Sequence, residues 1–182
     1  TAVEPSDTPA GTRVRALIAA GDEIWALTEP AFLPTTDPTG FLKTTDNEAA
    51  FTSYLTEVTD NNDSTAAILD SLDTAANGDY WYVGFNPDDT NTCAAWVYVR
   101  APNGTASVLA GQYWDGGTWQ TITDLYDGTS VGGVSLARSG VIHWGALAHA
   151  TKTINGTAAR WIRFSVSVAL DSEVEVQECR VV

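Results

Sequence analysis

The chain has 182 residues, of which 44% are hydrophobic and 18% are charged, a composition typical of one globular domain with a buried core. Its formal net charge of −14, from nine Lys and Arg against 23 Asp and Glu, argues against a nucleic-acid partner, because phosphate binding needs clustered cations. No stretch approaches the roughly 20 apolar residues of a membrane-spanning helix, so we expect no membrane partner either.

The first 44 residues predict an N-terminal arm followed by an extended, proline-rich segment. Residues 1–11 contain two prolines and no apolar periodicity, so they cannot contribute to a core. TRVRALI (12–18) and DEIWAL (22–27) alternate like two strands joined by a hairpin turn. In residues 29–46 three prolines exclude a helix or a central strand, and a connection of this length is either functional or bound to another surface. We predict that this part of the chain contacts a partner protein, through Val3, Pro5, Pro9, Pro30, Phe32, Leu33, Pro34 and Phe41.

Residues 49–72 are compatible with either strand or helix, on both sides of a polar turn, TDNNDS. For 64–72 we predict a short helix, because Ser64 is a suitable N-cap and the alanines and leucines that follow it favour helix.

From Asp79 onward the chain predicts an antiparallel β-sandwich of jelly-roll type. Segments rich in β-branched and aromatic residues alternate with clusters of Gly, Asn, Asp and Pro, without a helical pattern between them. The predicted strands are DYWYVGF (79–85), AAWVYVR (94–100), SVLAGQYW (107–114), TWQTITDLY (118–126), GVIHWGAL (140–147), ARWIRFSVSVAL (159–170) and EVEVQECRVV (173–182). The expected protein is mainly β, with an arm and extended segment over 1–44, a sandwich over 45–182, and at most one or two short helices.

QYWDGGTWQTITD (112–124) places two tryptophans beside a Gly-Gly turn. A two-residue loop sets Trp114 opposite Trp119, whereas a three-residue loop sets Tyr113 opposite Trp119. Either register gives a cross-strand aromatic cluster that needs no ligand. If the rings are instead exposed and coplanar on one sheet face, Trp81, Trp114 and Trp119 are the candidates for stacking against a glycan.

Candidate catalytic and metal-binding residues do not form a recognisable motif. Asp88-Asp89 follow a proline in a predicted loop, and DNND (60–63) lacks the residue order and the distal Glu of an EF-hand. His143 and His149 have no Ser or Cys nucleophile in a suitable turn. We therefore predict no catalytic residues, no metal and no cofactor.

Two further features have more than one interpretation. Cys93 and Cys179, the only cysteines, can form one disulfide if their Cα atoms lie within about 7 Å, but we prefer two buried thiols. If the protein is secreted by a eukaryote, Asn-Gly-Thr at 103–105 and 155–157 and Asn-Thr-Cys at 91–93 are glycosylation acceptors in surface loops, although Asn-Gly is also a common turn dipeptide.

Several motifs, in a fixed order, resemble a β-sandwich domain of virion structural proteins from tailed bacteriophages. They are YVGF (82–85), QYWDGGTWQTITD (112–124), DGTS (127–130), SGVIHW (139–144) and ARWIRFSVS (159–167). The likeness extends over roughly residues 45–182. It implies a head-decoration, fibre or tail-associated module, and it provides no catalytic residues.

We therefore expect a non-enzymatic virion structural protein, most simply a capsid decoration or auxiliary subunit. It would form homo-oligomers and bind a major capsid or other virion protein through its N-terminal arm, with assembly in the host cytoplasm and an extracellular location as part of the particle. The alternatives are a carbohydrate-binding module or host-adhesion fibre domain, and an extracellular filament or surface-layer subunit.

Overall fold

The computed structural model describes residues 14–20, 23–28, 35–45, 48–70 and 72–182. The chain divides into two compact units, Thr1–Thr35 and Thr36–Val182, which are described separately below. The partner contacts predicted at Val3, Pro5, Pro9, Pro30, Phe32, Leu33 and Pro34 lie outside the described residues.

The first unit contains an antiparallel hairpin of strands β1 (Val14–Ala20) and β2 (Glu23–Thr28). Ala20 stands opposite Glu23, and Leu17 opposite Ala26, while the register shifts by one residue between Val14 and Ala16. The hairpin predicted from TRVRALI and DEIWAL is confirmed.

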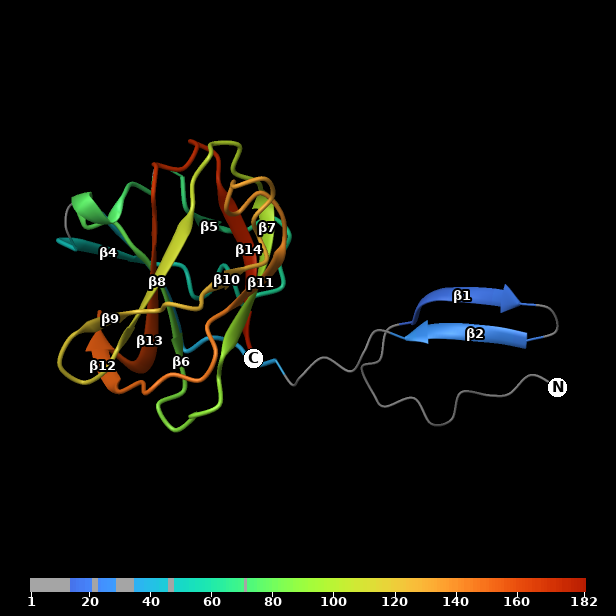
Figure 1. Cartoon of the computed structure of the whole chain (residues 1–182), viewed down its shortest axis with the longest axis horizontal. Helices are drawn as coiled ribbons and strands as arrows, with labels where there is room; N and C mark the ends of the chain where they lie inside the picture. Colours follow the sequence, from blue (N-terminus) through green and yellow to red (C-terminus); the bar gives the residue numbers. More distant parts are fainter. Residues whose placement is uncertain (1–13, 21–22, 29–34, 46–47, 71) are drawn as a thin grey trace. The chain divides into compact units, whose positions relative to one another are not determined.

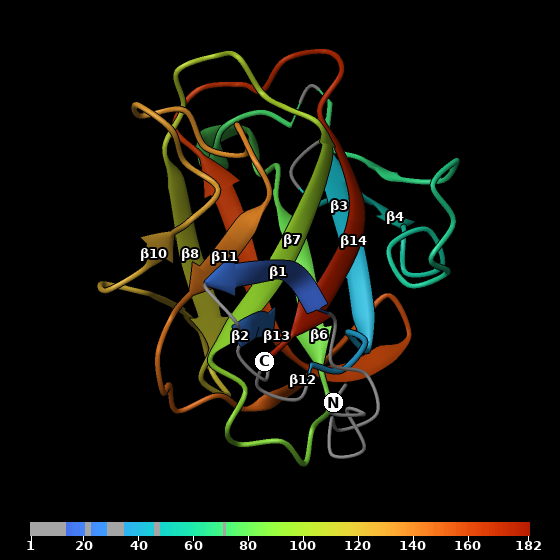
Figure 2. The ribbon, with the colours of Figure 1, turned by 90° about the vertical axis from the view of Figure 1, so that its right-hand side faces the viewer.

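The second unit is a sandwich of two antiparallel sheets (Figure 1). One sheet has five strands in the order β10-β11-β7-β14-β5, and Figure 2 looks onto this sheet, in which β11, β7 and β14 run side by side. The other has seven strands in the order β4-β3-β6-β13-β8-β9, with β12 also paired to β13. The strands are β3 (Gly40–Thr45), β4 (Ala50–Ser53), β5 (Ala67–Ile68), β6 (Trp81–Phe85), β7 (Ala94–Ala101), β8 (Leu109–Trp114), β9 (Trp119–Thr121), β10 (Tyr126–Asp127), β11 (Gly140–His143), β12 (Thr151–Ile154), β13 (Thr157–Val166) and β14 (Glu175–Val181).

The main hydrophobic core fills the space between the two sheets. Alternating residues of each strand face inward, as the period-two pattern of the sequence predicts. The five-stranded sheet contributes Val97, Ile142, Val176, Cys179 and Val181, and the seven-stranded sheet contributes Trp81, Phe85, Ile162, Phe164 and Val166. The predicted mainly β fold with a β-sandwich is confirmed.

Residues 36–44, which the sequence analysis assigned to the extended segment, belong to the sandwich instead. Strand β3 pairs with β4 on one side and with β6 on the other. Phe41 is fully buried, and the centre of its ring lies 5.4 Å from that of Trp81, so it is a core residue and not the predicted partner contact. Prolines exclude a central strand only where they stand, and the last of them, Pro38, precedes β3.

The helix predicted over 64–72 does not form. Ala67 and Ile68 pair with β14, and Leu69 and Leu72 are buried in the core. Within the described ranges the only helix is a single 3-10 turn, Ala75–Asn77. The helix propensity of this short segment is overridden by pairing and burial against the rest of the domain.

Candidate functional site

The seven-stranded sheet is apolar on both faces at its centre. All five residues of β6 are buried, but only Trp81, Val83 and Phe85 belong to the main core. A second set of residues, which we call the outer-face cluster, packs on the opposite face of this sheet. Its buried members are Leu42, Tyr82, Ile154, Ala159 and Trp161, and Phe51, Tyr80 and Trp119 pack half-buried against them. Antiparallel sheets commonly leave one face to water, so this extra apolar layer marks the outer face as the candidate site.

Trp161 anchors the cluster because two glycines make room for its indole. Gly40, Gly84 and Trp161 are aligned across the neighbouring strands β3, β6 and β13. A Cβ atom on Gly40 would lie 2.3 Å from Trp161 Cη2, and one on Gly84 would lie 2.8 Å from Cζ3. The indole therefore covers both glycines and is fully buried, while its Nε1 donates a 2.9 Å hydrogen bond to the carbonyl oxygen of Lys152 on β12.

Arg163, two residues further along β13, is held between two aromatic rings. Its guanidinium carbon lies 4.0 Å from the ring centre of Tyr80 and 4.4 Å from that of Trp119. Tyr80 is fixed by β3, because its backbone N–H donates to Thr44 Oγ1 at 3.0 Å and its carbonyl accepts from Thr44 N–H at 2.8 Å. The Arg163 side chain, only 12% exposed, thus joins β13 to β9 and to Tyr80, the residue just before β6, through cation–π contacts.

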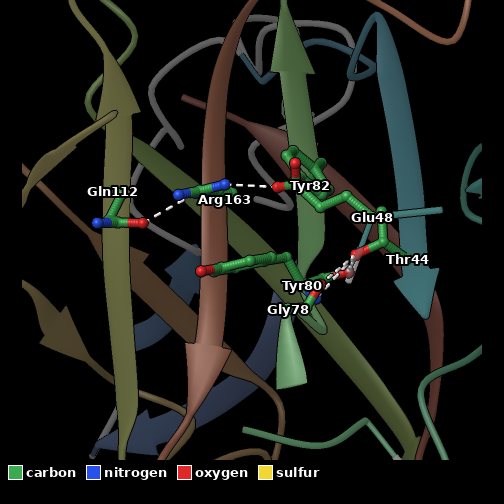
Figure 3. Close-up of polar contacts among 7 residues, drawn as sticks. All are labelled: Thr44, Glu48, Gly78, Tyr80, Tyr82, Gln112 and Arg163. Carbon is green, nitrogen blue, oxygen red and sulfur yellow. Dashed lines mark hydrogen bonds and ion pairs between the residues drawn. The ribbon is translucent and has the colours of Figure 1, made fainter. Parts of the chain in front are cut away.

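A polar network surrounds Arg163 on the same face (Figure 3). Its Nη1 donates to Glu48 Oε1 at 2.5 Å, and its Nε donates to Gln112 Oε1 at 2.9 Å. The Tyr82 hydroxyl donates to the same Glu48 oxygen at 2.5 Å. Burial, and then the adjacent Glu48 carboxylate, raise the pKa of Tyr82, so its hydroxyl remains a donor at neutral pH.

The hairpin of β8 and β9 extends this face toward solvent. Trp114 stands directly opposite Trp119, which confirms the two-residue-loop register, and Asp115 Oδ1 accepts hydrogen bonds from the N–H groups of Gly117 and Thr118. The two indoles meet edge to face at 69°, with ring centres 5.6 Å apart. Lys152 Nζ lies 3.5 Å from the centre of the Trp114 ring.

A groove of about 190 Å³ lies between the β12–β13 hairpin and the outer-face cluster. Its apolar walls are Phe51, Tyr82, Trp119 and Ile154, and its polar rim is formed by Glu48, Lys152 and the hairpin residues 153–155. Apolar walls with a few convergent polar groups are the usual composition of a small-molecule site. This lining makes the groove the candidate ligand site of the sandwich.

The exposed, coplanar tryptophan platform considered from the sequence is absent among the described residues. Trp81 is fully buried in the main core, and Trp144 and Trp161 are buried as well. Trp114 and Trp119 do share the outer face, but their rings lie at 69° to each other. Each also makes a cation–π contact, Trp114 with Lys152 and Trp119 with Arg163. The groove residues Glu48, Lys152 and Tyr82 escaped the sequence analysis, because they are far apart in the chain and match no local motif.

The two cysteines are free thiols. Cys179 stands opposite Val97 in the five-stranded sheet, and Cys93 precedes that position by four residues, or about 13 Å along an extended chain. This separation exceeds the reach of a disulfide. Cys179 is completely buried, and burial raises the pKa of its thiol, whereas Cys93 is partly exposed.

The acidic loops use their carboxylates to stabilise turns. Asp89 accepts hydrogen bonds from the N–H of Asn91 at 2.8 Å and from the Thr92 hydroxyl at 2.6 Å, and these bonds lower the pKa of Asp89, that from Thr92 most. In DNND, Asp60 accepts in the same way from the N–H of Asn62 and the hydroxyl of Thr65. Both loops thus have the turn structure considered in the sequence analysis.

The histidines and the asparagines of the Asn-Gly-Thr motifs lie in contrasting surroundings. His143 is exposed on β11, whereas His149 packs edge-on against the rings of Phe85 and Tyr113. Both ring nitrogens of His149 are buried, and neither has a hydrogen-bond partner among the residues that the structure describes. Asn103 is buried and donates to two backbone carbonyls, which leaves its amide inaccessible to a glycan, while Asn155 is exposed in a turn.

Across the described portion of the chain, no group of three or more His, Cys, Asp or Glu side chains is placed to hold a metal ion. No helix of that portion has the length and apolarity needed to cross a membrane. Comparisons of the chain with protein-family models, with curated proteins and with solved structures gave no match.

Proposed function

We propose that this chain is a non-enzymatic structural subunit of a tailed-phage-type virion, most simply a capsid decoration or auxiliary protein. The motifs that carry the resemblance form the framework of the sandwich: YVGF lies in β6, QYWDGGTWQ forms the β8–β9 hairpin, and ARWIRFSVS lies in β13. The resemblance therefore rests on residues that determine the fold.

The observation that carries the proposal is the division into a complete sandwich and a separate hairpin unit. The sandwich has its own core, whose described members extend from Phe41 to Val181. In the part of the first unit that the structure describes, β1 and β2 pair only with each other. An isolated two-stranded hairpin is marginally stable in water, and unpaired strand edges can add to the sheet of a partner. The first unit is thus suited to attachment, and the sandwich to display.

Sedimentation analysis of the whole chain and of residues 36–182 tests the role of the first unit. We expect the whole chain to form a homo-oligomer and the shorter chain to be a folded monomer. The point variant Leu17→Pro, which removes a backbone donor from the middle of β1, should behave like the truncation. If residues 36–182 form the same oligomer as the whole chain, or if the whole chain is monomeric, self-association through the first unit is ruled out.

Electron microscopy distinguishes the virion from other locations. An antibody against the sandwich should label intact virus particles from the source of the chain. Labelling of filaments or of a cell surface, with bare particles, would contradict the virion assignment and support the surface-layer alternative.

A further inference from the structure

We propose that the groove on the outer face of the seven-stranded sheet binds one acidic sugar ring, with the carboxylate of the sugar against the ammonium group of Lys152. This binding activity goes beyond the structural role proposed above, and it is independent of where the subunit is attached.

The size and the walls of the groove fit a single ring. Its volume of about 190 Å³ is below the roughly 300–1,000 Å³ of sites for drug-sized ligands. Phe51, Tyr82 and Trp119 line it together with Ile154, and aromatic side chains offer both apolar contact area and a polar edge. A pyranose has the matching combination of apolar C–H faces and peripheral hydroxyls.

Charge identifies the ligand as acidic. Lys152 has no carboxylate partner within the described residues, although the chain has 23 Asp and Glu against nine Lys and Arg. The sandwich's other described cations bond to a carboxylate or a backbone carbonyl, in the pairs Lys43–Asp70, Arg100–Glu175, Arg163–Glu48, Arg180–Glu178, Arg138–Gly128 and Arg160–Pro87. Lys152 is also held in place, because its ammonium lies over Trp114 and its carbonyl accepts from Trp161. Lys152 thus lines the groove without a carboxylate partner among the described residues, and Glu48, the carboxylate on the same rim, is already paired with Arg163, so the groove fits an anionic ligand.

The remaining rim groups fit the hydroxyls of a sugar. Glu48 uses one oxygen for both Arg163 and Tyr82, and its Oε2 accepts no hydrogen bond from the described residues. Thr153 and Asn155 are exposed on the hairpin beside it. The groove thus offers a carboxylate acceptor, a hydroxyl and an amide around its apolar walls. These groups can bond to the several hydroxyls of a sugar, whereas a flat aromatic acid has no hydroxyls to pair with them.

Nuclear magnetic resonance of the whole, isotopically labelled chain tests the proposal through the indole N–H signals of Trp114 and Trp119. The probes are methyl β-D-glucuronide, its neutral counterpart methyl β-D-glucoside, and acetate. The glucuronide should shift the Trp119 signal in a saturable manner, the glucoside should bind about tenfold more weakly, and acetate should cause no saturable shift. Equal affinities for the two sugars, saturable binding of acetate, or no shift with either sugar, would overturn the proposal.

Substitutions at the rim test the contact itself. Lys152→Gln should weaken glucuronide binding about tenfold, Lys152→Arg should retain it, and the matched control Arg138→Gln should leave it unchanged. Arg138 is suitable because it is exposed and donates to a backbone carbonyl in a distant turn. If Lys152→Gln disturbs the hairpin, Thr153→Glu provides a second test, since the added carboxylate should repel the glucuronide but not the glucoside. Unchanged glucuronide binding in folded Lys152→Gln or Thr153→Glu would refute the contact.

Discussion

The two glycines beneath Trp161 predict a graded loss of stability when they are replaced by alanine. In Gly84→Ala, the new Cβ would lie 2.8 to 3.0 Å from three atoms of the six-membered ring of Trp161. Ordinary carbon contacts are about 3.5–4.0 Å, so the indole must rise by roughly 0.5–1 Å. That movement strains the bond from Trp161 Nε1 to the Lys152 carbonyl and loosens the packing of the outer-face cluster.

The expected size of the loss follows from three terms. Overpacking costs about 1–3 kcal/mol, and weakening of the indole hydrogen bond adds about 1 kcal/mol. Alanine restricts the unfolded chain more than glycine does, and this stabilises the folded state by about 0.4–1 kcal/mol. We expect Gly84→Ala to lower the free energy of unfolding by about 1–3 kcal/mol. Gly40→Ala should lower it further, because its Cβ would approach Trp161 Cη2 to 2.3 Å.

Urea unfolding followed by tryptophan fluorescence measures this loss. With a denaturant slope of about 2 kcal/mol per molar urea, the midpoint for Gly84→Ala should fall by about 0.5–1.5 M. Gly117→Ala is the matched control: it lies in an exposed turn, and its nearest neighbour would be 3.7 Å from the new Cβ. In the Trp161→Phe background, the effect of Gly84→Ala should shrink to under about 0.5 kcal/mol, because the clashing ring atoms are gone. The same loss in both backgrounds would refute the steric explanation.

Three further predictions concern other parts of the sandwich. Burial, and then Arg160, lower the pKa of His149 to about 4 from an ordinary 6.5, so the unfolded chain takes up the proton first and stability falls as the pH drops from about 6.5 to 4. The full pKa shift corresponds to about 3 kcal/mol of unfolding free energy, and screening by water at the partly exposed ring reduces this to about 1–2 kcal/mol. The melting temperature of His149→Phe should lose this dependence on pH. The same pH profile in the variant and the original protein would contradict the role of His149. A thiol reagent should modify Cys93 alone in the native protein and both cysteines in urea, and rapid native labelling of Cys179 would contradict its burial. Arg163→Met, which leaves Glu48 unpaired beside Tyr82, should cost more unfolding free energy than Glu48→Gln, by about 1–2 kcal/mol, and equal losses in urea melts would refute the role of ring stacking.

Strands could be predicted from the sequence where the residues of the segment itself determine the structure, and were missed where pairing with distant segments determines it. β6, β7, β13 and β14 were predicted because β-branched and aromatic residues recur there between clear turn signals. β3 was missed because the prolines just before it masked a strand whose partners are β4 and β6. The segment 64–72 was assigned to helix from local propensity, which carries no information about the pairing of β5 with β14.

The candidate site was accessible from the sequence only at the β8–β9 hairpin. Trp114 and Trp119 are five residues apart, so their pairing follows from the turn. Glu48 and Arg163, by contrast, are 115 residues apart in the chain, and their contact depends on the order of strands in the finished sheet. A period-two pattern does indicate that Trp161 and Arg163 share a face. It cannot indicate that glycines on β3 and β6 leave room for the indole.

Burial of the seven-stranded sheet on both sides has a consequence for amide exchange with solvent. Strands β6 and β13 lie between neighbours on either edge and beneath apolar layers on both faces, so their backbone amides can open only when the whole domain unfolds. Short edge strands such as β4 and β10 need only local fraying. The slowest-exchanging deuterons should therefore trace the β6–β13 ladder, and their rates should report the global equilibrium between the native and denatured states.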